Sequence, residues 1–204
     1  MQGSPPIKKK SMPAPENVVD SLWLIWWISW WAAAAWSDRA AKRPAARHQI
    51  LYRVFAVVGA VLLFGLYRHD LQSEIVLWRT STAAAWGMVA LALVGLLFTW
   101  WARIHLGRLW SSSVERKANH RVVDTGPYGI VRHPIYTGVT LAAIATAALR
   151  GTAAAWLGAV VMTIGWYVKA RMEEAFLREQ LGAEEYDNYA GRVPMLVPFL
   201  PRPH

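Results

Sequence analysis

Five runs of apolar residues are the feature that most limits how this chain can fold. They cover residues 18–36, 50–66, 83–101, 134–149 and 152–168. Each run is close to the roughly 20 residues that an α-helix needs to cross about 30 Å of hydrocarbon. We therefore expect an all-α, polytopic membrane protein with about five transmembrane helices and a cytoplasmic, helical C-terminal tail.

The composition agrees with several spans that are separated by charged loops. Hydrophobic residues make up 55% of the chain and charged residues 17%. No cysteine is present, which excludes disulfides, thiolate metal sites and cysteine nucleophiles. Six tryptophans in the first run argue against reading residues 18–36 as a cleaved signal peptide, although three lysines precede it. We expect residues 1–17, which are basic and rich in proline, to be disordered.

The distribution of Lys and Arg orients the predicted spans. Most of these residues follow the first, third and fifth runs, and the side of a membrane protein that is richer in Lys and Arg is normally cytoplasmic. The N-terminus is then outside, although its three lysines favour the opposite orientation. This topology places segments 102–133 and 169–204 together on the cytoplasmic face of an inner or plasma membrane.

The formal net charge of +9 has two interpretations. A basic surface can bind nucleic acid. In a chain with several spans, however, contact with anionic membrane lipids and the orientation rule explain the same charge. We expect membrane lipids, and not nucleic acid, as partners.

The segment 119–138 concentrates polar residues and backbone breakers directly before the fourth apolar run. Gly126 and Pro127 are typical of a turn. His133 precedes a proline and is therefore expected to be extended, while Pro134 suits the first turn of a helix. The free N–H groups of that helix start favour a bound anion. The alternative is a basic loop that binds phospholipid head groups.

The tail after the fifth run reads as two short helices. Residues 171–181 form the first, which Gly182 ends. Tyr186 and Tyr189 then lie on one face of a second short turn. Glu173 and Glu174 point about 100° apart on a helix, so they address two different groups and do not share one proton. A solvated acidic pair is the alternative.

Residues in three places together resemble the integral-membrane methyltransferases of the isoprenylcysteine carboxyl methyltransferase type. They are, in chain order, His120, Gly126, Pro127, Tyr128, Arg132, His133, Pro134, Tyr136, Gly138, Glu173, Glu174, Tyr186, Tyr189, Arg192, Val197 and Pro198. The resemblance covers roughly residues 100 to 200. Phospholipid N-methyltransferases and small-thiol methyltransferases have related C-terminal halves, so the superfamily is indicated more strongly than any one member.

The resemblance implies an S-adenosylmethionine-dependent methyltransferase that acts on a lipophilic acceptor, with the carboxylate of an isoprenylcysteine-like compound as the expected substrate. The apolar runs predict three transmembrane helices in residues 18–101, and the resemblance implies a catalytic half in 102–204 without a metal. The expected cofactor-binding residues are His120, Gly126, Tyr128, Arg132, His133, Tyr136 and Glu173. Arg132 or the helix start at Pro134 is expected to hold the cofactor's carboxylate. Glu174 and Arg192 are expected to act on the acceptor.

Other activities stay open at this point. An amine or thiol acceptor must lose a proton, for which His133, Glu173 and Glu174 are candidate bases. Sterol C14-reductases share a similar C-terminal half and use a nicotinamide cofactor, but Ile135 and Val139 replace the polar residues that their motif carries. A non-catalytic protein that binds haem through His120 and His133 is a third possibility.

Overall fold

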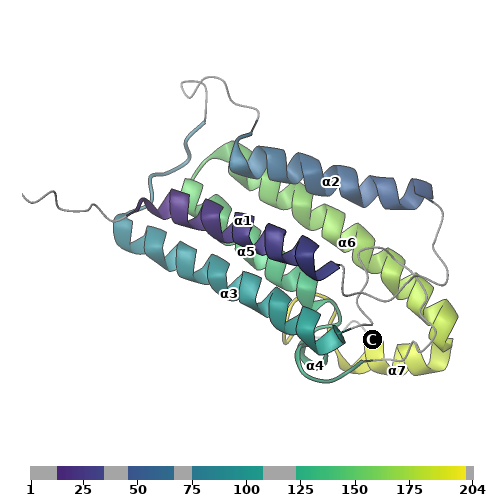
Figure 1. The fold of residues 1–204 in the computed structure, drawn as a ribbon. Helices are drawn as coiled ribbons and strands as arrows, with labels where there is room; N and C mark the ends of the chain where they lie inside the picture. The colour runs from purple at the N-terminus through teal and green to yellow at the C-terminus, as the bar shows by residue number, and fades with distance from the viewer. Residues whose placement is uncertain (1–12, 35–45, 67–74, 108–122, 201–204) are drawn as a thin grey trace, which may run out of the picture.

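The computed structural model describes residues 13–34, 46–66, 75–107 and 123–200. Five long helices lie along one bundle, and two short helices lie at one of its ends (Figure 1). The long helices are α1 (Pro15–Ala34), α2 (Ala46–Phe64), α3 (Thr82–Leu106), α5 (Pro134–Arg150) and α6 (Ala153–Leu181). The short ones are α4 (Pro127–Ile130) and α7 (Ala183–Arg192). The all-α fold class is confirmed for the described residues.

Two pairs of helices form the centre of the bundle, and glycines let each pair approach closely. α3 packs along α5, and α2 packs along α6 (Figure 1). A Cβ added to Gly95 would lie 2.6 Å from the carbonyl oxygen of Gly138, and one added to Gly59 would lie 2.8 Å from that of Gly158. Small residues at helix crossings are typical of packing within membranes, where the backbones must come together without a hydrophobic driving force.

The tryptophans of α1 hold this helix against the first pair. Trp23 Nε1 donates to Thr146 Oγ1 at 2.9 Å, and Trp26 Nε1 donates to Thr99 Oγ1 at 2.7 Å. Buried indole N–H groups need such acceptors, and the two threonines supply them from α5 and α3. The tryptophan-rich run is therefore part of the folded core.

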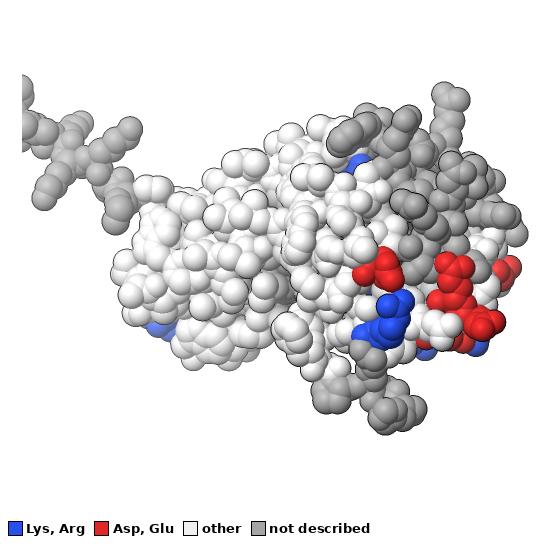
Figure 2. Space-filling model, turned by 90° about the horizontal axis from the view of Figure 1, so that it is seen from below, with Lys and Arg blue, Asp and Glu red and all other residues white. Residues whose placement is uncertain are grey.

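Much of the outer surface is apolar. Large hydrophobic side chains of α1, α2 and α3 are exposed, among them Trp27, Val57 and Leu97. Figure 2 shows an uncharged surface over most of one face, with charged residues gathered toward the end where α7 lies. Among the described residues, helices Thr82–Leu106 and Ala153–Gln180 are long and apolar enough to cross a membrane by length and composition. Five spans and the side of the tail remain predictions.

The turn between α5 and α6 forms a tight antiparallel hairpin. Gly151 adopts the left-handed conformation, with φ 63° and ψ 25°, and Thr152 caps the next helix by accepting from Ala155 N at 3.3 Å. The apolar run and the first tail helix are one continuous helix, α6, because no breaker separates residues 168 and 171. α1 begins at Pro15, inside the segment expected to be disordered; residues 1–12 lie outside the described residues.

Candidate active site

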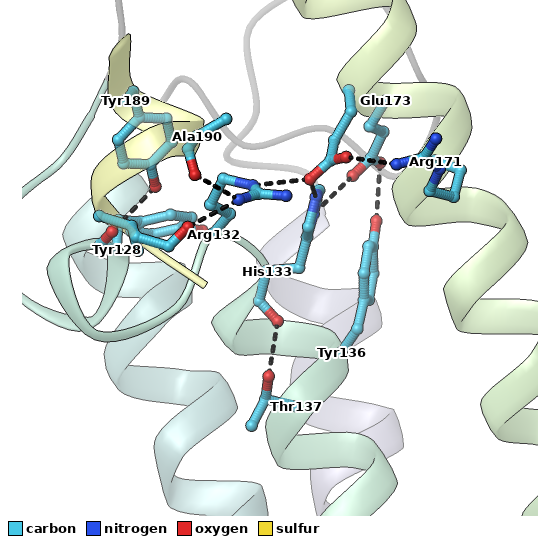
Figure 3. A network of polar contacts seen from close by, with 11 residues as sticks. Tyr128, Arg132, His133, Tyr136, Thr137, Arg171, Glu173, Tyr189 and Ala190 are labelled. Atoms are coloured by element: carbon cyan, nitrogen blue, oxygen red, sulfur yellow. Dashed lines mark hydrogen bonds and ion pairs between the residues drawn. The ribbon is translucent and has the colours of Figure 1, made fainter. Parts of the chain in front are cut away.

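The start of α5 and the C-terminal part of α6 meet at the end of the bundle that α4 and α7 close (Figure 1). Figure 3 shows Arg132 and His133 pointing from the loop before α5 toward carboxylates on α6. The expectation that the two motif-bearing segments lie together is confirmed by these contacts. Pro134 occupies the first turn of α5, also as predicted.

His133 lies between two carboxylates. Its Nε2 is 3.3 Å from Glu174 Oε1, and its Nδ1 is 3.6 Å from Glu173 Oε2. Burial by itself would lower the pKa of His133, but the hydrogen bonds and charges of Glu173 and Glu174 outweigh burial and raise this pKa above its ordinary value. The imidazole, with a carboxylate beside each nitrogen, orients both acids. The two glutamates address different atoms, as their spacing on α6 predicted.

Glu173 is the more accessible of the two acids. Its side chain is 21% exposed, against 9% for Glu174. Its Oε1 accepts a hydrogen bond from Tyr136 Oη at 2.6 Å and lies 3.6 Å from Lys169 Nζ. The Tyr136 ring is stacked between His133 and Trp166, with ring centres 5.5 and 5.4 Å apart. The carboxylate of Glu173 is therefore held at the edge of an aromatic stack.

Arg132 ties this cluster to the tail. Its Nε donates to Glu174 Oε1 at 2.7 Å, and its Nη1 donates to the carbonyl oxygens of Ala190 at 3.0 Å and Val193 at 2.6 Å (Figure 3). Hydrogen bonds between a charged donor and a buried acceptor are among the stronger ones in proteins. Through these contacts Arg132 anchors α7 and the residues after it to the site.

The tail also covers the beginning of α5 through its backbone. The carbonyl of Pro194 accepts from Arg132 N at 2.8 Å, and that of Met195 accepts from His133 N at 3.1 Å. Thr137 Oγ1 donates to the next carbonyl, that of Leu196, at 2.6 Å. Three consecutive tail carbonyls thus accept from two backbone N–H groups just before α5 and from the Thr137 hydroxyl, beside the helix start where the sequence predicted a place for the cofactor's carboxylate.

The predicted turn at Gly126 packs against the end of α3. Gly126 has φ 57°, and a Cβ added to it would lie 2.8 Å from the His105 ring, so glycine is required for both conformation and space. Tyr128 is buried in the helical turn that follows, and burial raises its pKa. Tyr189 Oη donates to the Tyr128 carbonyl at 2.8 Å, which anchors α7 to this turn.

Arg192, a predicted acceptor-side residue, lies apart from this cluster. Arg192 is 65% exposed, and its Nη2 is 3.2 Å from Asp124 Oδ2 on the surface. It does not contact Glu174 in the described structure, and its role toward an acceptor remains a prediction. His120 lies outside the described residues. No group of three or more metal-ligating side chains occurs among the residues that the structure describes.

Sequence reasoning missed Lys169, Trp166 and Tyr52, which surround Glu173 and Tyr136. Lys169 and Trp166 could have been predicted from the sequence, because they lie four and seven residues before Glu173 and so share its helix face. Tyr52 could not have been predicted, since it belongs to α2 and reaches the site only through the packing of α2 on α6.

Comparisons with known proteins agree with the motif-based reading. Residues 88–179 match the model of the isoprenylcysteine carboxyl methyltransferase (ICMT) family. Methanethiol S-methyltransferase 1 of Bradyrhizobium diazoefficiens is 29% identical over 80% of this chain and 58% of its own length. Protein-S-isoprenylcysteine O-methyltransferase B of Arabidopsis thaliana is 34% identical over 43% of this chain and 44% of its own. Cobalt-zinc-cadmium resistance protein CzcN of Cupriavidus metallidurans is 29% identical over 80% and 69%, respectively.

The chain therefore spans 58% and 44% of the lengths of the first two relatives. The matched residues 88–179 contain most of α3, the Gly126 turn, the start of α5 and both glutamates. The part of the chain that the family model covers is the part that builds the polar cluster.

Proposed function

Because this chain belongs to the isoprenylcysteine carboxyl methyltransferase superfamily, we propose that it is a membrane methyltransferase that uses S-adenosylmethionine to methylate a lipophilic acceptor. The observation that carries the proposal is the cluster of His133, Glu173 and Glu174. It combines the motif before α5 with the acidic pair of α6 at one end of an apolar bundle. When bound, the cofactor supplies a methyl group on a positively charged sulfur.

The residues present fit such a cofactor. The partly exposed carboxylate of Glu173 suits an ammonium or a ribose hydroxyl group. Two buried polar atoms, Tyr52 Oη and Trp166 Nε1, lack a hydrogen-bond partner in the described structure.

Methyl transfer to an anionic acceptor needs alignment and exclusion of water more than it needs a base. The tail contributes to both, because it closes over the start of α5 through Arg132 and three backbone carbonyls. His133, held between its two acids, fixes the direction in which Glu173 and Glu174 point. Glu174 is buried against Arg132 and acts through this arrangement.

For the acceptor we propose the carboxylate of an isoprenylcysteine-like compound, with Glu174 and Arg192 on the acceptor side. A small thiol is the second candidate, and two observations favour it. The methanethiol methyltransferase relative aligns with 80% of the chain. Arg192, which would hold an acceptor carboxylate, is occupied by Asp124.

The test is turnover by the purified full chain in detergent, with S-adenosylmethionine and either a farnesylated cysteine derivative or methanethiol as acceptor. Methylation of either compound supports the proposed function and selects the acceptor. Glu173→Gln should abolish most of this turnover, whereas Glu185→Gln, on the exposed face of α7, should leave it unchanged. Absence of binding of both S-adenosylmethionine and S-adenosylhomocysteine would refute the proposal.

A further inference from the structure

One of the groups that the sequence offered for the cofactor's carboxylate is already engaged. The side chain of Arg132 bonds to Glu174, Ala190 and Val193. The backbone N–H groups of Arg132 and His133, just before α5, bond to the tail. Other donors near the cluster are therefore candidates for holding a ligand's carboxylate.

Lys169 stands in a cage of aromatic rings beside the cluster. Its Nζ lies 5.2 Å from the ring centre of Tyr52, 5.3 Å from that of Tyr136 and 5.9 Å from that of Trp166. The side chain is 7% exposed, and three helices contribute to the cage. A buried ammonium is costly unless it is paired, and Glu173, at 3.6 Å, supplies one opposite charge.

Two of the three rings bring donors that have no acceptor. Tyr52 Oη is buried in a residue that is 3% exposed, and Trp166 Nε1 is buried as well. An unmade hydrogen bond of this kind is destabilising, and most buried polar groups in proteins do find a partner. Both donors belong to rings whose centres lie within 5.2 and 5.9 Å of Lys169 Nζ, so a hydroxyl, an indole N–H and an ammonium occur in one small region of the bundle.

We propose that Tyr52, Trp166 and Lys169 form a subsite for the carboxylate of the methyl donor's amino-acid end, and that Glu173 receives the adjacent α-ammonium. This inference rests on the proposed function. An amino acid carries its two charges on neighbouring atoms, and the pair of Lys169 and Glu173 presents the complementary charges 3.6 Å apart.

Calorimetry on the full chain in detergent tests the subsite with three ligands. S-adenosylhomocysteine has the whole amino-acid end, its decarboxylated analogue keeps only the ammonium, and 5′-methylthioadenosine has neither charge. Tyr52→Phe keeps the ring and removes only the hydroxyl. It should lower the affinity for S-adenosylhomocysteine about ten-fold or more, because the lost hydrogen bond is to a charged group. The affinities for the other two ligands should not change, and Trp166→Phe should give the same selectivity.

Trp156→Phe is the matched control. Trp156 also has a buried indole N–H without a partner, but it packs on Trp78 at the other end of α6. Its replacement should leave all three affinities unchanged. Equal losses for all ligands in Tyr52→Phe, or no loss for any, would overturn the subsite. If wild-type protein binds none of the three ligands, the proposed function fails with it.

Discussion

Each end of α5 carries a largely buried arginine, and the two arginines have different surroundings. Arg132, before the helix, is 12% exposed and pairs with Glu174, which is 9% exposed and is also held by His133. Arg150, at the last residue, is 17% exposed and pairs with Asp20, which is 46% exposed. One pair belongs to a buried network, and the other ends in solvent or at the membrane surface.

The neighbouring donors differ in the same way. At the Arg150 end, Trp78 Nε1 and Thr80 Oγ1 both donate at 3.0 Å to the carbonyl of Ala148. They satisfy carbonyls that every helix leaves open at its C-terminus. At the Arg132 end, side-chain donors converge on two carboxylates. Similar residue types therefore have different roles at the two ends of α5. They cap the helix at the Arg150 end and bring ionisable groups together at the Arg132 end.

The largest difference between the ends should appear on removal of a carboxylate. Glu174→Ala leaves Arg132 and His133 buried without their shared acid, which should lower the free energy of unfolding by about 3 kcal/mol or more. Asp20→Ala removes the exposed partner of Arg150 and should cost at most about 1 kcal/mol. Chemical denaturation in detergent measures both values. Similar losses in the two variants would contradict the distinction between the ends.

A second variant tests whether the Arg150 end is purely structural. Gly151→Ala places a Cβ against the carbonyl oxygen of Trp78 and forces a non-glycine residue into φ 63°, so it should cost about 1–3 kcal/mol of stability. Gly87→Ala is the control, since a Cβ there meets nothing within 4 Å on an exposed helix face. Folded Gly151→Ala protein should bind S-adenosylhomocysteine with unchanged affinity. A selective loss of binding would couple the two ends.

The smallest and most specific effect concerns pH. The pKa of His133 is raised in the folded protein, so the stability that its charge contributes is fully present below its ordinary value of about 6.5. That contribution is lost as the pH rises through the raised pKa. The free energy of unfolding should therefore fall over this range in wild-type protein and fall less in His133→Gln. Identical pH profiles in the two proteins would show that a charged His133 does not contribute to the stability of the cluster.

Local chemistry made several features predictable. Gly126 with positive φ, Pro134 at a helix start and the hairpin at Gly151 follow from backbone preferences of single residues. The meeting of the two motif segments followed from counting spans. The role of Arg132 could not be predicted in this way. It donates to the backbone carbonyls of Ala190 and Val193, and no pattern of side chains identifies such acceptors.

Packing between distant helices accounts for the other omissions. The aromatic cage at Lys169 needs Tyr52, whose position depends on how α2 crosses α6 at Gly165. Apolar periodicity indicates that a helix exists, but it does not fix which residue of one helix faces which residue of another. The continuity of α6 was missed because the sequence changes from apolar to charged residues at 168. This change in composition was read as the end of a helix, but the helix continues through it.

The fastening of the tail has a consequence for how the protein is made. Arg132 bonds to carbonyls that lie 58 and 61 residues later in the chain. At translation rates of about 5–20 residues per second, the loop waits roughly 3–12 s for these partners. Glu174 follows Arg132 by 42 residues, so for most of that interval Arg132 also lacks its carboxylate partner. A chain that stops before residue 190 therefore leaves the guanidinium without the two carbonyls that anchor the tail.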